Sequence, residues 1–317
     1  MKVTEHISKA KETLISFEIL PPLKGKTIES IYNQLNPLME FHPAFINVTY
    51  HRSEQMFKKR SDGTFEKVEV RKRPGTVGIC AALMNRYKVD AVPHLICGGF
   101  SKQETENALI DLHFLGIDNV LILRGDAAKN ETVFKPEEDG HLYALDLLKQ
   151  VINLNHGIYL EDDIQDGHKT DFCIGVAGYP EKHFESPNLQ SDLHYLQKKV
   201  AAGADYVTTQ MFFDNRKYFE FVKQCRELNI NVPIIPGLKP LTTKRQLSTL
   251  PRTFHVDIPA ELSEAVMKCK SDAEVEKVGE EWLYQQSKEL MENGAPVLHY
   301  YILGKHQVIA NVMKKLL

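Results

Sequence analysis

Short runs of apolar and β-branched residues recur along the chain, and eight of them have the length of strands. They lie at 14–20, 44–50, 91–97, 119–124, 171–177, 205–211, 232–236 and 297–303. Between most of them are amphipathic stretches with helical spacing, clearest at 102–115, 141–155, 189–204 and 216–228. Strands that alternate with helices indicate a parallel sheet. Eight such units predict an α/β fold that closes into a (βα)8 barrel of the TIM type.

Two segments depart from a minimal barrel. The first is an insertion after the second strand, residues 51–91, with eight Lys or Arg against four Asp or Glu between residues 52 and 73. It either embraces an anionic ligand or forms a solvated hairpin around Ser61-Asp62-Gly63, and we favour the hairpin. The second, residues 259–291, predicts about two extra helices before the eighth strand, with Trp282 packed among them.

The composition is that of an ordinary soluble protein. The 317 residues are 43% apolar and 26% charged, and the formal charge of −3 offers no excess of positive charge for nucleic acid or anionic lipid. Five cysteines without a C-x-x-C pair favour a reducing cytoplasm, and Cys80 and Cys173 read as small buried residues. No run has the length of a membrane span, and the amino terminus lacks the apolar region of a signal peptide. We therefore expect a cytoplasmic protein with one domain over residues 1–317 and small-molecule partners.

A carboxylate stands at the end of the first apolar run. In a (βα)8 barrel the active site lies at the carboxyl ends of the strands. Alternation along the run turns Phe17 and Ile19 toward the helical shell and Glu18 into the barrel. A buried carboxyl without a cationic partner tends to hold a proton, which is the state that a general acid requires. The alternative is a structural ion pair between Glu18 and an inward Lys or Arg.

The next strand ends offer groups that suit a flat ligand with a phosphate. The second run ends with the hydroxyl of Thr49, and the third contains the imidazole of His94 before a glycine pair. The fourth ends in Leu-Arg-Gly-Asp. Arg124 can fork onto a phosphate, Gly125 lets the backbone approach a ligand closely, and Asp126 adds a negative charge.

The later strands and helices add further candidates. Asp192 and Lys199 are seven residues, or two helical turns, apart, a spacing that can bracket an adenosine or can hold two solvated charges. The carboxamide of Gln210, at the end of the sixth run, can both donate to and accept from a heterocycle. No metal site is expected, because His94 and Cys97 lack further ligands at a suitable spacing.

Taken in order, these strand ends resemble the methylenetetrahydrofolate reductase family across nearly the whole chain. The motifs that carry the resemblance are SFEILPP, NVTY, PHLICGG, ILRGD, VAGYPEKH, TTQMFFD, IIPGLKP and LHYYIL. The resemblance is to the short bacterial members, so it implies a single catalytic domain without a carboxyl-terminal regulatory domain. It also implies a homo-oligomer.

The resemblance implies FAD as the cofactor, which agrees with the lack of a G-x-G-x-x-G motif after any strand. NADH or NADPH would reduce the flavin, and 5,10-methylenetetrahydrofolate would then be reduced to the 5-methyl form by a ping-pong mechanism that feeds methionine synthesis. Glu18 corresponds to the acid that opens the folate ring, and Asp126 tunes the charge of the flavin and of the iminium that accepts hydride. The resemblance places near FAD the residues Thr49, His94, Arg124, Gly125, Asp126, Tyr143, Ala144, Tyr179, His183, Asp192 and Lys199. It places near the folate Gln210, Gln246 and Lys305.

Two competing functions remain at this point. One is a related FAD barrel that oxidises an amino acid such as proline, and the other is a barrel that binds flavin or folate without catalysis. Glu18 and Gln210 argue against the first, and the presence of Glu18 argues against the second. Three positions depart from the family pattern: Leu250, where some relatives have a stacking Phe; Lys305, where many have Arg; and His51 in the insertion.

Overall fold

Eight parallel strands close a barrel in the computed structural model, which describes residues 1–128, 131–164 and 166–317. The strands follow the order β1-β10-β9-β8-β7-β6-β5-β2 around the barrel. Their bounds are β1 (Leu14–Ile19), β2 (Phe45–Val48), β5 (Asp90–Ile96), β6 (Asn119–Leu123), β7 (Cys173–Gly178), β8 (Tyr206–Met211), β9 (Ile234–Leu238) and β10 (Val297–Tyr301). The predicted (βα)8 barrel is confirmed, and each predicted run differs from its strand by at most two residues at either end.

Helices cover the outside of this barrel. They are α3 (Thr76–Tyr87), α4 (Lys102–Phe114), α5 (Ala144–Asn155), α6 (Leu189–Ala201), α7 (Asn215–Glu227), α8 (Gln246–Phe254), α9 (Ala260–Lys268), α10 (Asp272–Glu292) and α11 (His306–Leu316). The two extra helices expected before the eighth barrel strand are α9 and α10. Trp282 on α10 packs against the apolar cluster there and donates its indole N–H to the Phe213 carbonyl at 3.0 Å. No helix among the described residues has the length and apolar composition needed to cross a bilayer.

Short elements at the amino terminus escaped the sequence analysis. These are α1 (Val3–Lys9), α2 (Glu29–Leu35) and the 3-10 helix η1 (Asn36–Phe41). In α1 only Val3 is buried, so the helix has no apolar periodicity to detect. Val3 donates its backbone N–H to Asn119 Oδ1 at 2.8 Å and joins the apolar cluster inside the barrel.

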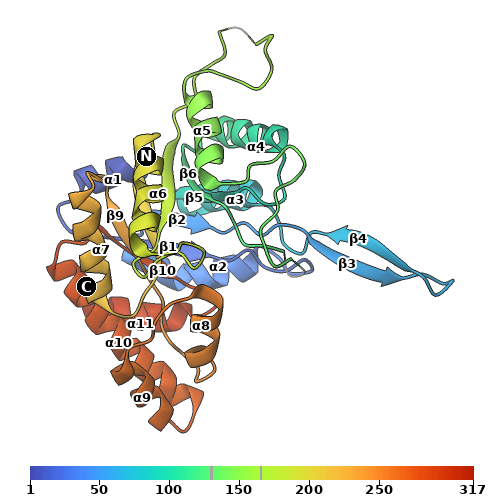
Figure 1. Ribbon diagram of the computed structural model, residues 1–317. Coiled ribbons are helices and arrows are strands. Elements are labelled where there is room, and N and C mark those ends of the chain that lie inside the picture. Colours follow the sequence, from blue (N-terminus) through green and yellow to red (C-terminus); the bar gives the residue numbers. More distant parts are fainter. Residues whose placement is uncertain (129–130, 165) are drawn as a thin grey trace.

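The insertion after β2 is a two-stranded hairpin that projects away from the barrel (Figure 1). Its strands are β3 (Glu54–Lys59) and β4 (Phe65–Val70). In the turn between them, Asp62 accepts a hydrogen bond from the Thr64 backbone at 2.9 Å. The predicted solvated hairpin is confirmed, and even its aromatic residues Phe57 and Phe65 are each 66% exposed.

Alternation along the strands divides the barrel interior into an apolar floor and a polar mouth. The floor is built from Phe45, Val92, Leu121, Cys173, Tyr206, Ile235 and Val297. Toward the carboxyl ends, the same inward phase carries Glu18, Asn47, His94 and His299, all buried. The polar mouth therefore lies at the strand ends, where the sequence placed the candidate site.

Candidate active site at the carboxyl ends of the barrel strands

Glu18 lies in the barrel mouth between two imidazoles. Its Oε2 is 3.4 Å from His94 Nε2 on β5 and 3.4 Å from His299 Nε2 on β10. Ser16, two residues earlier on β1, places its Oγ 2.8 Å from His299 Nδ1 and so orients that ring. The inward orientation of Glu18 is confirmed. Its partners are imidazoles, and no Lys or Arg of the described residues forms the ion pair that was the alternative.

His94 is held in its neutral form. Burial lowers its pKa, and the nearby His299 lowers it further, while Glu18 opposes the shift. Asn47 Nδ2 lies 3.2 Å from His94 Nε2. With Asn47 donating there, His94 Nε2 is an acceptor and carries no proton that it could donate to Glu18.

Groups from the insertion and from β10 complete the surroundings of Glu18. Burial and the neighbouring Arg73 lower the pKa of His51, whereas Asp126 and Glu18 raise it, so His51 lies within electrostatic reach of both carboxylates. On β10, Tyr301 donates its hydroxyl to the Thr209 carbonyl at 2.7 Å. The base of the hairpin thus borders the mouth although its tip projects into solvent.

The Leu-Arg-Gly-Asp motif forms the turn that follows β6. Gly125 has a φ of 82°, a left-handed conformation that favours glycine. Arg124 Nη1 donates to Glu185 Oε2 at 2.5 Å. Asp126 is exposed at the rim and acts electrostatically on Tyr179 as well as on His51. The turn therefore presents a cation and a carboxylate on either side of one glycine.

The end of β7 and helix α6 bring together four more predicted cofactor residues. Asp192 Oδ2 accepts from the His183 backbone N–H at 2.9 Å, and the rings of His183 and Tyr179 meet edge to face at 4.8 Å. Lys199 Nζ donates to the Ala177 carbonyl at 3.0 Å. Burial lowers the pKa of Lys199 to about 8, although Asp192 opposes the shift. Asp192 and Lys199 thus share one environment, as their two-turn spacing predicted.

Several polar atoms at the mouth lack a partner among the described residues. Thr49 Oγ1 and Asn47 Oδ1 are buried without a hydrogen bond. Buried polar atoms are rarely left unpaired, so these two fit a ligand that presents donors in the barrel mouth. A flavin has such a polar edge, and its phosphates match the cations Arg124 and Lys199. The residues present therefore fit the cofactor that the resemblance implies.

The residues predicted near the folate already have protein partners. Gln210 accepts from the Met211 backbone N–H at 2.9 Å, and Gln246 accepts from the Thr242 backbone at 2.6 Å. Lys305 pairs with Glu276 of α10. The remaining predicted cofactor residues, Tyr143 and Ala144, lie at the start of α5, where Tyr143 is exposed and Ala144 is packed against the core.

Leu250 lies in the apolar cluster outside the barrel. It is 4% exposed and shares that cluster with Met211 and Phe213. Phe254 packs against the same cluster. Both side chains thus pack among α8, α9 and α10.

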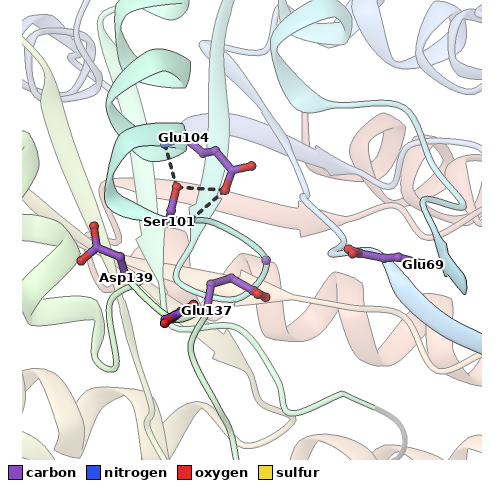
Figure 2. A pocket seen from close by; sticks show the side chains of 7 residues that line it. Glu69, Ser101, Glu104, Glu137 and Asp139 are labelled. Atoms are coloured by element: carbon purple, nitrogen blue, oxygen red, sulfur yellow. Dashed lines mark hydrogen bonds between the residues drawn. The ribbon is translucent and has the colours of Figure 1, made fainter. Parts of the chain in front are cut away.

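An acidic hollow of about 540 Å³ lies at the base of the hairpin (Figure 2). Five carboxylates line it, together with Gly99 and Ser101: Glu69, Glu104, Glu137, Glu138 and Asp139. Carboxylates at this density repel phosphates. The hollow gives no support to the view that the basic insertion embraces an anion at this point.

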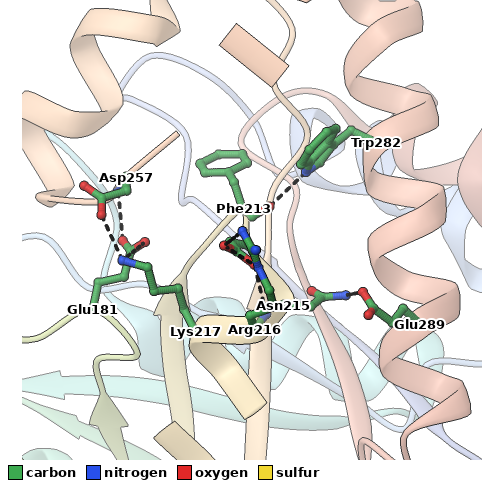
Figure 3. Close-up of polar contacts among 9 residues, drawn as sticks. Glu181, Phe213, Asn215, Arg216, Lys217, Asp257, Trp282 and Glu289 are labelled. Atoms are coloured by element: carbon green, nitrogen blue, oxygen red, sulfur yellow. Dashed lines mark hydrogen bonds and ion pairs between the residues drawn. The ribbon is translucent and has the colours of Figure 1, made fainter. Parts of the chain in front are cut away.

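A second carboxyl of the strand-end motifs is also buried. Glu181, in the loop after β7, accepts from the Asp257 backbone N–H at 2.8 Å, and Lys217 Nζ lies 3.9 Å from it (Figure 3). Burial raises the pKa of Glu181 to about 7. Nearby, Asn215 Nδ2 donates to Glu289 of α10 at 2.6 Å, which ties the start of α7 to this helix (Figure 3).

Two residues of the mouth were missed from the sequence. His299 and Asn47 both lie on the inward phase of their strands, so the alternation that selected Glu18 could have found them. A third, Lys239, directly follows β9 and is 5% exposed. A lysine in the motif IIPGLKP gave no sign of burial, because its burial depends on neighbouring strands.

The fold and the mouth define a (βα)8 barrel with a candidate active site at its strand ends, and comparisons with known proteins give the family. A family model described as methylenetetrahydrofolate reductase matches residues 2–317. The 5,10-methylenetetrahydrofolate reductase of Escherichia coli is 30% identical over 298 residues, covering 93% of this chain and 87% of the relative. The chain belongs to the methylenetetrahydrofolate reductase family.

Other relatives are longer. Methylenetetrahydrofolate reductase (NADH) 1 of Arabidopsis thaliana is 31% identical over 329 residues, which are 100% of this chain and 51% of the relative. A Caenorhabditis elegans relative, named as a probable NADPH form, is 28% identical. The match covers 98% of this chain and 43% of the relative. The chain thus spans about half the length of these eukaryotic relatives. A Clostridium thermocellum protein, described as binding two copies of 5-methyl-5,6,7,8-tetrahydrofolic acid, shares the fold with a TM-score of 0.58 at 14% identity, covering 99% of this chain and 98% of that one.

Proposed function

We propose that this chain reduces 5,10-methylenetetrahydrofolate to 5-methyltetrahydrofolate, with FAD as cofactor and NADH or NADPH as electron donor. The observation that carries the proposal is Glu18, a buried carboxyl that faces two imidazoles at the mouth of a barrel of this family. Bound FAD would supply hydride transfer between the nicotinamide and the folate. The two substrates would use one face of the mouth in turn, and the product would serve methionine synthesis.

Glu18 is proposed to hold the proton that opens the imidazolidine ring of the folate. Protonation at a ring nitrogen makes that nitrogen a leaving group, and the iminium that results accepts hydride. His94 is neutral and accepts a hydrogen bond from Asn47 at Nε2, so it does not compete with Glu18 as the proton donor in this proposal. Once Glu18 has lost its proton, its charge can be stabilised by a hydrogen bond from His299.

The other proposed roles follow from charge. Asp126 lies at the rim, where a fixed negative charge favours a cationic iminium and disfavours additional negative charge on the reduced cofactor. Arg124 and Lys199 are proposed to hold phosphates, and Asp192 a ribose hydroxyl. Thr49 and Tyr179 offer hydroxyls to the ring system.

Replacing Glu18 by Gln tests the proposal. The amide keeps the size of the side chain but cannot donate the ring-opening proton, so we expect NADH to bleach the flavin of Glu18→Gln at the wild-type rate. Reoxidation by methylenetetrahydrofolate should slow by about 100-fold or more, the lower range for general acid catalysis. Stopped-flow absorbance measures the two half-reactions separately.

A matched control is Glu106→Gln. Glu106 is also buried, but it lies on α4 and accepts the Leu160 backbone N–H at 3.0 Å, away from the mouth. Both of its half-reactions should match the wild type. Equal slowing of the two half-reactions in Glu18→Gln would show that Glu18 is not the acid, and a wild-type protein that cannot bind FAD would remove the proposed function.

A further inference from the structure

Lys239 has a largely buried side chain, and its ammonium has no partner among the residues that the structure describes. It directly follows β9, and only 5% of the residue is exposed. No hydrogen bond or ion pair joins its ammonium to a described residue. A buried charge without compensation is costly, so such a group is usually found where an opposite charge binds.

The register of the strands places Lys239 in the barrel mouth. On β9 and β10, Gly237 is paired with His299 and Leu238 with Tyr300, so Lys239 comes level with Tyr301. Tyr301 is in turn paired with Glu18 of β1. Lys239 and Glu18 are therefore two strands apart at the same height, roughly 10 Å between backbones.

Alternation also turns Lys239 inward. Ile235, four residues earlier, lies in the apolar floor of the barrel. Gly237 is on the same phase, and a Cβ atom there would meet the ring of Tyr301 at 2.7 Å. Lys239 continues this inward series, whereas Leu238 packs in the outer core.

A second lysine lies nearby, and it has the carboxylate partner that Lys239 lacks. Burial, together with the charge of Lys305, lowers the pKa of Lys239 to about 8. Lys305 pairs with Glu276 of α10. Two ammonium groups against one carboxylate leave one positive charge unmatched at this edge of the mouth.

We propose that Lys239, together with Lys305, binds a carboxylate of the glutamate tail of the folate. This inference rests on the proposed function, because the tail is the anionic end of that substrate. A single lysine cannot grip a carboxylate with two parallel hydrogen bonds as an arginine does. Two lysines, each donating to one oxygen, provide the same two charge-assisted bonds. Lys239 is thus a specificity-determining residue for substrates with an anionic tail.

The test measures equilibrium binding to the FAD-loaded full chain by titration calorimetry, with two probes. One is 5-methyltetrahydrofolate, and the other is its α,γ-diamide, which has the same shape without the tail charges. The wild type should bind the first at least about 100-fold more tightly, since each of the two charge-assisted bonds contributes about 10- to 100-fold. In Lys239→Met this preference should fall by about 10-fold or more, while the bond from Lys305 remains. Lys239→Arg should keep it.

Lys244→Met is the matched control, since the exposed Lys244 donates to the Met267 carbonyl outside the mouth and should leave the preference unchanged. The wild type offers a test that needs no substitution. Lys239 loses its proton as the pH rises through about 8, so the preference should decline between pH 7 and 9. Lys199 titrates in the same range, but it should affect the binding of both probes equally. Its effect therefore cancels in the ratio of the two affinities. The other titratable groups at this edge are Lys305, Glu276, Tyr301 and Glu18.

The outcomes separate this inference from the proposed function. Failure of the wild type to bind either probe defeats the proposed function. Binding of both probes with equal affinity overturns the role of Lys239 alone, and so does a Lys239→Met variant that keeps the full preference. A Lys239→Met variant with a raised KM for NADH and an unchanged probe preference would show that Lys239 binds the nicotinamide substrate. That result would also overturn its role in binding the folate tail.

Discussion

The charged ammonium of Lys199 is expected to lower the stability of the apoprotein and to strengthen the binding of FAD. Lys199→Met should separate these two effects. Burial lowers the pKa of this lysine from an ordinary 10.5 to about 8. At 1.36 kcal/mol for each tenfold change, the charged form costs the folded apoprotein about 3 kcal/mol. The side chain is only half-buried, and the variant loses the hydrogen bond to Ala177, so we reduce the expected gain to about 1 to 2 kcal/mol.

The sign of the pH dependence follows from the two pKa values. Between pH 8 and 10.5 the unfolded chain keeps the Lys199 proton while the folded protein releases it, so wild-type stability rises with pH. Below pH 8 both states are charged, and the full cost is present. The advantage of Lys199→Met should therefore be constant near pH 7 and should vanish as the pH approaches 10.5.

The assay is urea denaturation of the apoprotein at several pH values, because bound FAD adds its own stabilisation. FAD affinity, measured by fluorescence quenching, should fall about 10- to 100-fold in Lys199→Met, since a charged contact to phosphate is lost. Lys198→Met is the control. Lys198 is exposed one residue earlier, near the ring of Tyr195, and its loss should leave both quantities nearly unchanged. An apoprotein destabilised at pH 7, or an advantage that does not shrink above pH 8, would refute the reasoning.

Two further predictions concern stability. Tyr206 is fully buried in the barrel floor, and its hydroxyl has no described partner. Tyr206→Phe should therefore raise the free energy of unfolding by about 1 kcal/mol in urea melts. A decrease of similar size would mean that the hydroxyl has a hydrogen-bond partner. Burial raises the pKa of Glu181 to about 7, so the stability of the wild type should fall as the pH rises from 4.5 to 7. Glu181→Gln should remove that slope and raise the free energy of unfolding by about 2 kcal/mol at pH 8. An unchanged slope in Glu181→Gln would assign the pH dependence to another group.

The barrel could be predicted because its strands depend on local pattern. Buried parallel strands such as Asn119–Leu123 are continuous apolar runs, and helices such as Lys102–Phe114 begin at a capping serine, Ser101. The helix Val3–Lys9 could not be found in this way. It is defined by a tertiary contact, the hydrogen bond from Val3 to Asn119, more than 100 residues away in the chain.

Single residues at the mouth could be predicted where one strand was enough. Alternation within β1 turned Glu18 inward, and the same rule applied to β10 would have selected His299. The contacts between them could not be predicted, because they depend on which strands are adjacent. The closing pair of β1 and β10 brings together Ser16 and His299, which are 283 residues apart.

The burial of Lys239 could not be predicted from its own strand. A lysine after an apolar run is ordinarily a solvated residue, and nothing within IIPGLKP says otherwise. Its burial requires the register of β9 on β10. Its neighbour Lys305 pairs with Glu276, which lies on a helix inserted before β10. The unmatched charge is therefore a property of three elements together. If the extra helices supply the carboxylate that occupies Lys305, they also determine that Lys239 is the cation left free for a substrate.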